Sequence, residues 1–548
     1  MHTVFRALSG PLLVVALAGC GDFLAVGNSN DPDRSRVLSD PEQLEARTAD
    51  AFRAVHASTI GGNGGIAMLS RALSGEHENW PMGMDLFNRI PRAPIDNSRG
   101  NAAGIYNLTS FSGLSRAART AADGLRAMAV RGYSLGSAAR DARLKAFAWF
   151  TLGVAQGNLA LSYDSAAVVD PRADPVDWPP LVGYRDGMAI ALGYLDSALA
   201  WTNAAVVAAG ANGFPLPSTW INGNALTAAQ FTQLVRTTKA RFRADVARTK
   251  TEGDAVAWQA VLDDAANGIT ADLVVTMQAA PWWNVFDCSC GEWAQAHQFY
   301  IGMADTSGGY DAWLQTPLAL KAPFLVVTPD LRFPRGTTSA AQQANSPAVR
   351  AGVQLLCNRS RPPYPSAFAS PYDNYRILTF AATPFPSGYS VLLHNQNDML
   401  QAEALLRAGS IPAAAALIDL YRTRAGLPAL SGVITALGQA VPGGTTANPV
   451  PGGASCVPRI PIAGATMAPW TRCGDIWEAM KWEFRMENMF VGYATWYFAA
   501  RRWRDLPEGT ALHWPVPWHE MDTRRQPFYD LGGVGGRDGQ VGKGTYGL

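Results

Sequence analysis

The sequence predicts a mostly α-helical protein, with a scaffold of tetratricopeptide-like helix pairs and an irregular, loop-rich subdomain. Three observations predict this class. Alanine-rich amphipathic segments recur along the first half of the chain, and short glycine-bearing loops join some of them. A helix hairpin of about 34 residues, the size of one tetratricopeptide unit, begins near residue 394. Between these regions, residues 270–390 are rich in Pro, Gly, Trp, Tyr and Asn and show little helical period.

The first helices are predicted from their start signals and their periodic apolar residues. Helical pattern begins at Ser39-Asp40-Pro41-Glu42, where Ser or Asp can cap and Pro41 suits the first turn. Because each following segment has one apolar stripe to bury, antiparallel helix pairs are favoured. These segments are Ser115–Ala129, Ser137–Asn158, Tyr184–Ala200, Ala228–Thr249 and Ala255–Asn267.

Residues 270–390 are expected to form a long irregular region with a few short strands. So long a stretch without regular structure is unusual in a compact protein, and where it occurs it is usually functional. We therefore expect functional side chains in this region.

Helical pattern returns sharply after residue 393. A helix is predicted over Asn395–Arg407 and ends at Gly409, which suits a C-cap. Pro412 lies in the first turn of the next helix, whose apolar residues recur at helical spacing until Gly426 ends it. These start and stop signals agree with a helix hairpin.

The last part of the chain is predicted to hold one long helix. A Gly- and Pro-rich loop covers about residues 431–472, and the helix is expected from Cys473 to Arg502. The tail from Pro515 onward is turn-rich.

The N-terminus resembles the leader of a bacterial lipoprotein. Arg6 precedes an apolar stretch, Ala7–Gly19, which is shorter than the roughly 20 residues that cross a bilayer. It ends Leu17-Ala18-Gly19-Cys20, a branched residue and two small residues before a cysteine. We expect residues 1–19 to be a signal peptide and Cys20 to carry the acyl chains that anchor the protein. The alternative is an ordinary signal peptide that happens to contain a cysteine.

Charge and hydropathy exclude some partners. The chain has 45 Lys+Arg and 44 Asp+Glu with no basic tail or stripe, so nucleic acid is not an expected partner. After Leu17 we find no apolar run long enough to span a membrane. The body is therefore expected to be soluble and to reach the membrane through its lipid anchor.

The cysteines predict a limited disulfide framework. Lipidation of Cys20 leaves five others, so at most two disulfides form and one thiol stays free. Cys456 and Cys473 flank a loop with several prolines and glycines and are expected to pair first. Cys288-Ser289-Cys290 could be read as a metal site, but no second cysteine pair has zinc-finger spacing. No metal is expected. The five remaining cysteines are Cys288, Cys290, Cys357, Cys456 and Cys473.

No motif predicts catalysis or a cofactor. The string Gly132-Tyr133-Ser134-Leu135-Gly136 follows a helical segment, whereas a nucleophile elbow follows a strand, so we interpret it as a helix connection. Glu403 lies mid-helix among alanines and leucines, and we expect a structural ion pair with Arg422 or Arg424 in preference to a general acid. The protein is predicted not to be an enzyme.

Six motifs, in order along nearly the whole chain, resemble those of one family. They are Phe23–Pro32, Asp330-Leu331-Arg332, Asn397–Gly409 with its Ala-Glu-Ala core, Leu420–Pro428, Trp482–Glu487 followed by Gly492, and Pro515–Met521. With these motifs the chain resembles the SusD/RagB family of outer-membrane nutrient-binding lipoproteins. The sequence departs from the family where a Glu-Arg pair reads Glu483-Phe484 and a Glu-Gly pair reads Val491-Gly492. These departures concern local ion pairs more than the fold.

The resemblance implies an architecture and partners. It implies a single domain over residues 20–548, with four tetratricopeptide-like helix pairs as scaffold at about 39–270 and 391–505. The irregular subdomain, at about 271–390 plus the loop 431–472, would carry the ligand site. Family members lie as a lid on a TonB-dependent outer-membrane barrel (SusC-like) and deliver oligosaccharides, or peptides in some members, to it. The resemblance therefore implies a lipid-anchored, surface-exposed protein of the outer membrane.

Candidate ligand-binding residues are those that pair flat aromatic faces with hydrogen-bonding edges. An aromatic ring can cover the C–H face of a sugar while polar neighbours bind its hydroxyls. One group lies in an early loop and the other in the middle region, and the alternative is that these aromatics only pack the irregular subdomain. The candidates are Asn79, Trp80, Trp282, Trp283, Trp293, Tyr310 and Trp313.

Two other functions remain as alternatives. A tetratricopeptide-type scaffold that binds only protein partners would show a smooth, polar surface over residues 280–315, whereas ligand capture predicts exposed aromatics there. A surface glycosidase would need two acidic side chains about 5–10 Å apart in a cleft.

Overall fold

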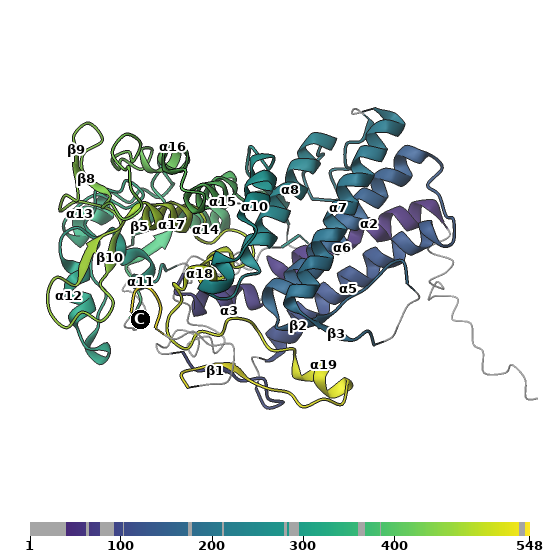
Figure 1. The fold of residues 1–548 in the computed structure, drawn as a ribbon, viewed down its shortest axis with the longest axis horizontal. Coiled ribbons are helices and arrows are strands. Elements are labelled where there is room, and N and C mark those ends of the chain that lie inside the picture. The colour runs from purple at the N-terminus through teal and green to yellow at the C-terminus, as the bar shows by residue number, and fades with distance from the viewer. Residues whose placement is uncertain are drawn as a thin grey trace, which may run out of the picture.

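The computed structural model confirms a mostly helical protein in which the strands form short two-stranded pairs (Figure 1). The described residues are 40–61, 65–76, 92–101, 104–173, 178–210, 213–278, 282–283, 295–359, 368–383, 385–535 and 543–547. In Figure 1 the long N-terminal helices lie at one end of the molecule, and the elements after residue 298 gather mostly at the other.

The N-terminal scaffold consists of long helices packed side by side, with α5 and α7 on α6 and α2 on α5. The predicted cap at Asp40 is present, since Asp40 accepts a hydrogen bond from Gln43 N at 2.9 Å, and Ser137 caps the next predicted segment by accepting one from Arg140 N. The helices are α2 (Pro41–Thr59), α3 (Ile66–Leu73), α5 (Gly104–Ala129), α6 (Ala138–Ser162), α7 (Tyr184–Ala209), α8 (Ala228–Asp245), α9 (Lys250–Asp254) and α10 (Trp258–Ala266).

Two buried arginines satisfy the C-terminal end of α6. Arg248 donates to the carbonyls of Ala160 at 2.5 Å and Tyr163 at 3.0 Å, and Arg501 donates to that of Leu161 at 2.9 Å. The last carbonyls of a helix have no partner within it, and a cation there also favours the helix dipole. These contacts tie the end of α6 to the C-terminal part of the chain.

The helix α7 meets the length and hydropathy expected of a membrane span, which corrects the sequence-based statement that no such run follows Leu17. Length and composition are weak evidence, since a core helix of a soluble protein meets the same criteria. One face of α7, with Ala191, Leu195 and Ala198, is fully buried, and the helix packs against α6 and α8. In this structure α7 buries one face against its neighbours and leaves its other face at the surface.

The irregular region contains short helices and strand pairs. The strands are β4 (Leu273–Met277) with β7 (Ser387–Leu392), β5 (Leu356–Asn358) with β6 (Tyr372–Asn374), β8 (Pro442–Gly444) with β9 (Pro449–Pro451), and β10 (Arg459–Pro461) with β11 (Thr471–Cys473). Elsewhere β1 (Pro94–Ile95) pairs with β12 (Leu531–Gly532), and β2 (Ser165–Ala167) with β3 (Leu181–Gly183). The helices are α11 (Gln298–Ile301), α12 (Gly309–Gln315), α13 (Ser339–Ala344) and α14 (Tyr375–Ala382), with 3₁₀ turns at Gly302–Ala304 and Leu318–Leu320.

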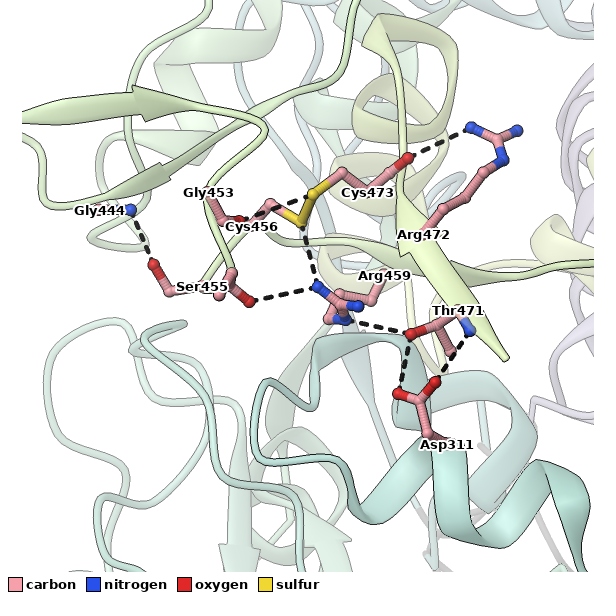
Figure 2. The surroundings of a disulfide bond; sticks show 10 residues. Asp311, Gly444, Gly453, Ser455, Cys456, Arg459, Thr471, Arg472 and Cys473 are labelled. Atoms are coloured by element: carbon pink, nitrogen blue, oxygen red, sulfur yellow. Dashed lines mark hydrogen bonds between the residues drawn. A yellow bond between two sulfur atoms is a disulfide. The ribbon is translucent and has the colours of Figure 1, made fainter. Parts of the chain in front are cut away.

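The predicted disulfide between Cys456 and Cys473 is present, with 5.8 Å between the Cα atoms (Figure 2). Beside it, the carboxylate of Asp311 on α12 accepts hydrogen bonds from Thr471 N and Thr471 Oγ1, both at 2.9 Å. These contacts bind the loop 431–472 to the short helices of the irregular region. Cys357 is buried, and its Sγ lies 3.6 Å from the carbonyl oxygen of Asp373, whereas Cys288 and Cys290 lie outside the described residues.

The predicted helix hairpin is present as α15 (His394–Arg407) and α16 (Ile411–Arg422). Gly409 has φ +76° and Gly426 has φ +77°, a left-handed conformation that glycine adopts without steric cost. The mid-helix Glu403 forms a buried ion pair as expected, but with other partners than predicted: Arg502 at 2.7 Å and Arg407 at 3.0 Å. Burial alone would raise the pKa of Glu403, but these arginines lower it overall, which does not suit a general acid.

The single long helix predicted over Cys473–Arg502 is wrong. The structure has α17 (Ile476–Glu487) and α18 (Thr495–Trp503), followed by α19 (Trp518–Thr523). Side chains from the start of the chain bind the segment between α17 and α18. Phe490 N donates to Glu76 at 2.6 Å, and the carbonyl of Gly492 accepts from Arg71 at 2.5 Å. Phe490 and Gly492 have positive φ, which is incompatible with a continuous helix.

Candidate functional site

The structure describes four of the seven predicted ligand-binding residues. Asn79, Trp80 and Trp293 lie outside the described residues. Trp282 is buried, with 5% of its surface exposed, and Trp283 is half-buried. Both follow β4 and lie against the C-terminal half of α2.

Trp282 and Trp283 are fixed to α2 by ring packing and by one hydrogen bond. The Trp282 ring lies 5.0 Å from the ring of His56 and 6.4 Å from that of Phe52, between centroids. The Nε2 of His56 is 2.9 Å from the carbonyl oxygen of Trp283. A Cβ on Gly61 would lie 2.7 Å from that same oxygen, so the close approach requires glycine here.

The electrostatic state of His56 follows from its burial. Desolvation lowers the pKa of His56 to about 4, against a smaller opposite effect of the Trp283 carbonyl. The imidazole is therefore neutral near pH 7, and its Nε2–H donates to Trp283. A buried donor holds the Trp282–Trp283 segment on the helix.

Tyr310 and Trp313 on α12 do not form an exposed platform. Both are buried, with 0% and 3% of their surface exposed. Their rings stack at 5.9 Å, and Lys321 Nζ lies 3.9 Å from the Trp313 ring centroid. The packing alternative therefore describes these two residues, because their faces are covered by Phe324, Phe368 and Lys321.

A cavity of about 610 Å³, which we call the α2 pocket, lies beside Trp282. It is bounded by one face of α2, the start of α6, the loop before α8 and the segment after β4. Its lining residues are Glu42, Glu45, Ala46, Ala49, Asp50, Arg53, Arg140, Arg143, Pro217, Thr219, Trp220, Asn222, Gln278 and Trp282.

The polar side of the α2 pocket is built from ion pairs. Arg143 Nη2 donates to Glu45 Oε1 at 3.3 Å, and Arg140 binds the other oxygen of the same carboxylate. Arg53 and Asp50, both about half-exposed, pair at 2.7 Å. This wall therefore presents acceptors and donors side by side.

The apolar side of the α2 pocket has a tryptophan that the sequence analysis missed. Trp220 is 7% exposed, packs on Phe147 at 4.9 Å and lies beneath the guanidinium of Arg143 at 5.6 Å. Trp220 lies in a proline-bearing loop beside Thr219 and Asn222. Trp283 was chosen as a candidate because its neighbours have a similar composition. That local signal could have identified Trp220.

The α2 pocket combines two tryptophan side chains with guanidinium, carboxylate and amide groups. Ligand pockets of proteins typically have volumes of roughly 300–1,000 Å³ with a few placed polar groups, and this cavity lies in that range. Such a lining can accept and donate hydrogen bonds to a polyhydroxylated or amide-bearing ligand. Among the described residues no group of three His, Cys, Asp or Glu side chains could hold a metal ion.

Comparisons with known proteins address the fold. No family model matches the chain, and no curated protein matches it. Among solved structures, a SusD superfamily protein from Bacteroides vulgatus ATCC 8482 matches with a TM-score of 0.50 and 13% identity, over 88% of this chain and 97% of its own. A SusD-like protein from Bacteroides fragilis NCTC 9343 matches with a TM-score of 0.50 and 12% identity, over 85% and 87%. The chain therefore has the fold of the SusD superfamily, as its motifs predicted.

Proposed function

We propose that this protein captures an oligosaccharide or a similar nutrient at the cell envelope and binds it in the α2 pocket. The observation that carries the proposal is the pairing of Trp220 and Trp282 with Glu45, Arg53 and their polar neighbours around one cavity. Aromatic rings suit the C–H surface of a sugar, and the carboxylate and guanidinium groups suit its hydroxyls. The SusD-like fold supports the same function class.

We further propose that Cys20 is lipidated, that the body lies at the outer membrane, and that the captured ligand passes to a TonB-dependent barrel. The support is the leader Leu17-Ala18-Gly19-Cys20 and the resemblance of the sequence motifs to SusD/RagB lipoproteins. On this proposal the ligand-loaded protein and the barrel form one complex.

Binding in the α2 pocket is proposed to be non-catalytic. Glycoside hydrolysis needs two carboxyl groups that reach the scissile bond. Both oxygens of Glu45 are occupied, one by Arg140 and the other by Arg143. Glu45 therefore positions these two arginines, and Asp50, another carboxylate of the pocket, is paired with Arg53 at 2.7 Å.

A second candidate is a scaffold that binds only protein partners. The burial of Tyr310 and Trp313 favours it, because exposed aromatics over residues 280–315 were the feature expected of a ligand platform. The α2 pocket favours ligand capture, because a smooth polar surface would lack a cavity of this size.

The test is a glycan and peptide array probed with the mature protein, followed by calorimetric titration of the best ligand with two pocket variants. Arg53→Ala and Gln278→Ala remove polar side chains from the rim of the α2 pocket at little cost in stability, since both are at the surface. Each is expected to weaken binding about tenfold. The matched control is Arg47→Ala, an exposed arginine on α2 that does not line the pocket.

The outcomes separate the two candidates. Ligand binding that both rim variants weaken supports capture in the α2 pocket. An affinity that is unchanged in both variants would mean that the ligand binds at another site. If the array shows no ligand while a protein partner other than a barrel co-purifies from detergent, the scaffold function replaces capture.

A further inference from the structure

A second cavity, which we call the arginine pocket, lies where the start of α15 meets the ends of α16 and α17. Its volume is about 340 Å³, and it shares no lining residue with the α2 pocket. Its lining residues are Asp272, Arg350, Gly352, Val353, Arg376, Leu393, His394, Asn395, Tyr421, Arg424 and Glu487.

The acidic groups of the arginine pocket already bind donors from the protein. Glu487 pairs with Arg424 at 3.3 Å and with Arg332 at 3.5 Å. Asp272 Oδ1 accepts the backbone N–H of His394 at 2.9 Å. Both carboxylates therefore bind groups of the protein itself. Three guanidinium groups line the same pocket, those of Arg350, Arg376 and Arg424.

Arg350 brings the excess positive charge. Its exposed side chain forms no hydrogen bond or ion pair with any described residue, whereas Arg376 donates to the carbonyl of Met489 at 2.6 Å. Desolvation lowers the pKa of Arg350, and the charges of Arg376 and Arg424 lower it further against the pull of Glu487. Like charges held together in this way are relieved when an anion binds between them.

Asn395 provides a buried donor without a partner. Its side chain is 3% exposed and lines the pocket, and its Nδ2 has no hydrogen-bond acceptor among the described residues. The orientation of the amide is determined by its neighbour: Asn488 Nδ2 donates to Phe484 O at 2.9 Å and to Asn395 Oδ1 at 2.6 Å. Asn395 therefore accepts from Asn488 with its oxygen and keeps its N–H₂ for another acceptor.

The start of α15 adds to the positive potential. This helix has 14 residues, its N-cap Leu393 makes no side-chain hydrogen bond, and Asp272 accepts only the first N–H, that of His394. Helix N-termini carry partial positive charge and bind anions. His394, Asn395 and Leu393 line the pocket at this end of the helix.

We propose that the arginine pocket is a binding site for the carboxylate of a small organic acid, with a uronic-acid sugar as the probe that fits its size. Arg350 donates to the carboxylate from the solvent side, and Asn395 Nδ2 donates from the buried side. A guanidinium fork matches a planar carboxylate, so the acid is favoured over a neutral sugar. The site lies on other elements than the α2 pocket, and its existence does not depend on nutrient capture there.

The test is calorimetric titration of the full mature chain at low ionic strength, because salt screens such interactions. The ligands are D-glucuronate, D-glucose and inorganic sulfate. Glucuronate is expected to bind and glucose not. Arg350→Ala is expected to weaken glucuronate binding at least tenfold. Asn395→Asp retains the acceptor for Asn488 but places a carboxylate beside the ligand, and it is expected to abolish binding.

Controls make each outcome decisive. Arg335→Ala, an exposed arginine of the same region outside the pocket, is expected to leave glucuronate binding unchanged, and the melting temperature shows whether each variant folds. Glucuronate binding that survives both pocket variants overturns the proposal, as does equal binding of glucose. Binding of sulfate without glucuronate also overturns it, since the site then takes only a tetrahedral inorganic anion. None of these outcomes bears on Arg53 and Gln278, so failure here is distinct from failure of nutrient capture.

Discussion

The guanidinium of Arg332 and the carboxylate of Glu483, 151 residues apart in the sequence, lie 2.8 Å apart with both side chains fully buried. Asp330 holds the same guanidinium at 2.7 Å and accepts the indole N–H of Trp482 at 3.0 Å. Arg332 belongs to the irregular region, and Glu483 lies on α17. The family-like motif Asp330-Leu331-Arg332 thus meets the family-like motif Trp482–Glu487, and the departure at Phe484 does not disturb the pair.

Replacing Arg332 should destabilise the protein strongly. Arg332→Ala leaves the carboxylates of Asp330 and Glu483 buried without their common cation, and the loss of one partner of a buried pair costs about 3–5 kcal/mol. Burial raises the pKa of Glu483 to about 7 against the pull of Arg332 and Arg422, so Glu483→Gln, which resembles the neutral acid, should cost far less. Urea unfolding measures the free energy of unfolding of the two variants and the parent.

The control for this pair is Arg335→Ala, three positions away and exposed, which should change the free energy of unfolding by less than about 0.5 kcal/mol. Equal losses for Arg332→Ala and Arg335→Ala would mean that the buried pair does not stabilise the junction.

His56 should make stability depend on pH on the acid side of neutrality. Its pKa is about 4 in the folded protein against 6.5 in the unfolded chain, so the unfolded chain binds more protons between these values. Stability is therefore lost as the pH falls from about 6.5 towards 4. At 1.36 kcal/mol per pKa unit the loss from this group is about 3 kcal/mol.

The variant His56→Gln retains a donor for Trp283 O and cannot be protonated, so the difference between its unfolding midpoint and that of the parent should reverse or shrink at low pH. His394→Gln is the opposite control, because the hydrogen bond that His394 donates to Asp398 raises the pKa of His394, and the resulting stabilisation is lost as the pH rises. Parallel midpoints for His56→Gln and the parent at pH 4.5 and pH 7 would contradict the assignment of a neutral, buried imidazole.

Removing the disulfide should loosen one loop more than the whole protein. Cys456 and Cys473 close a loop with a sequence separation of 17, for which chain-entropy arguments give about 3 kcal/mol. The double replacement by serine should therefore expose residues 431–472 to proteolysis at temperatures where the helical scaffold is intact. The Cys357→Ser variant, which replaces a buried cysteine outside this disulfide, should keep the parental cleavage pattern in that loop. An unchanged cleavage rate in the disulfide variant would show that Asp311 and its hydrogen bonds are sufficient.

Much of the helical scaffold could be predicted because its signals are local. The caps Asp40 and Ser137, and the glycines after α15 and α16, act within a few residues of the helix ends that they define. The break between α17 and α18 could not be predicted in this way. Its cause is the contact of Phe490 and Gly492 with side chains more than 400 positions earlier, which no local pattern records.

The residues of the candidate site, too, could be predicted only as far as local signals reach. Trp282 was found from its local composition, and its packing on α2 depends on a return of the chain that composition does not specify. Trp313 has a similar composition around it but faces Phe324 and Phe368 in the interior. Composition identifies residues able to bind a ligand, and the tertiary fold determines which of them meet a cavity.

Ligand binding in the α2 pocket should respond to a change that touches no pocket residue. In Gly61→Ala the new Cβ would lie 2.7 Å from Trp283 O and 3.2 Å from Ala57 Cα, so the Trp282–Trp283 segment must move away from α2. Because Trp282 forms part of the pocket wall, affinity for the array-selected ligand should fall about tenfold, or about 1.4 kcal/mol. Titration calorimetry measures it, and hydrogen exchange over residues 273–278 reports the displacement. Gly193→Ala, on α7 with open space around its Cβ, is the matched control and should leave affinity unchanged. Faster exchange with full affinity would show that Trp282 lines the pocket without contributing to binding.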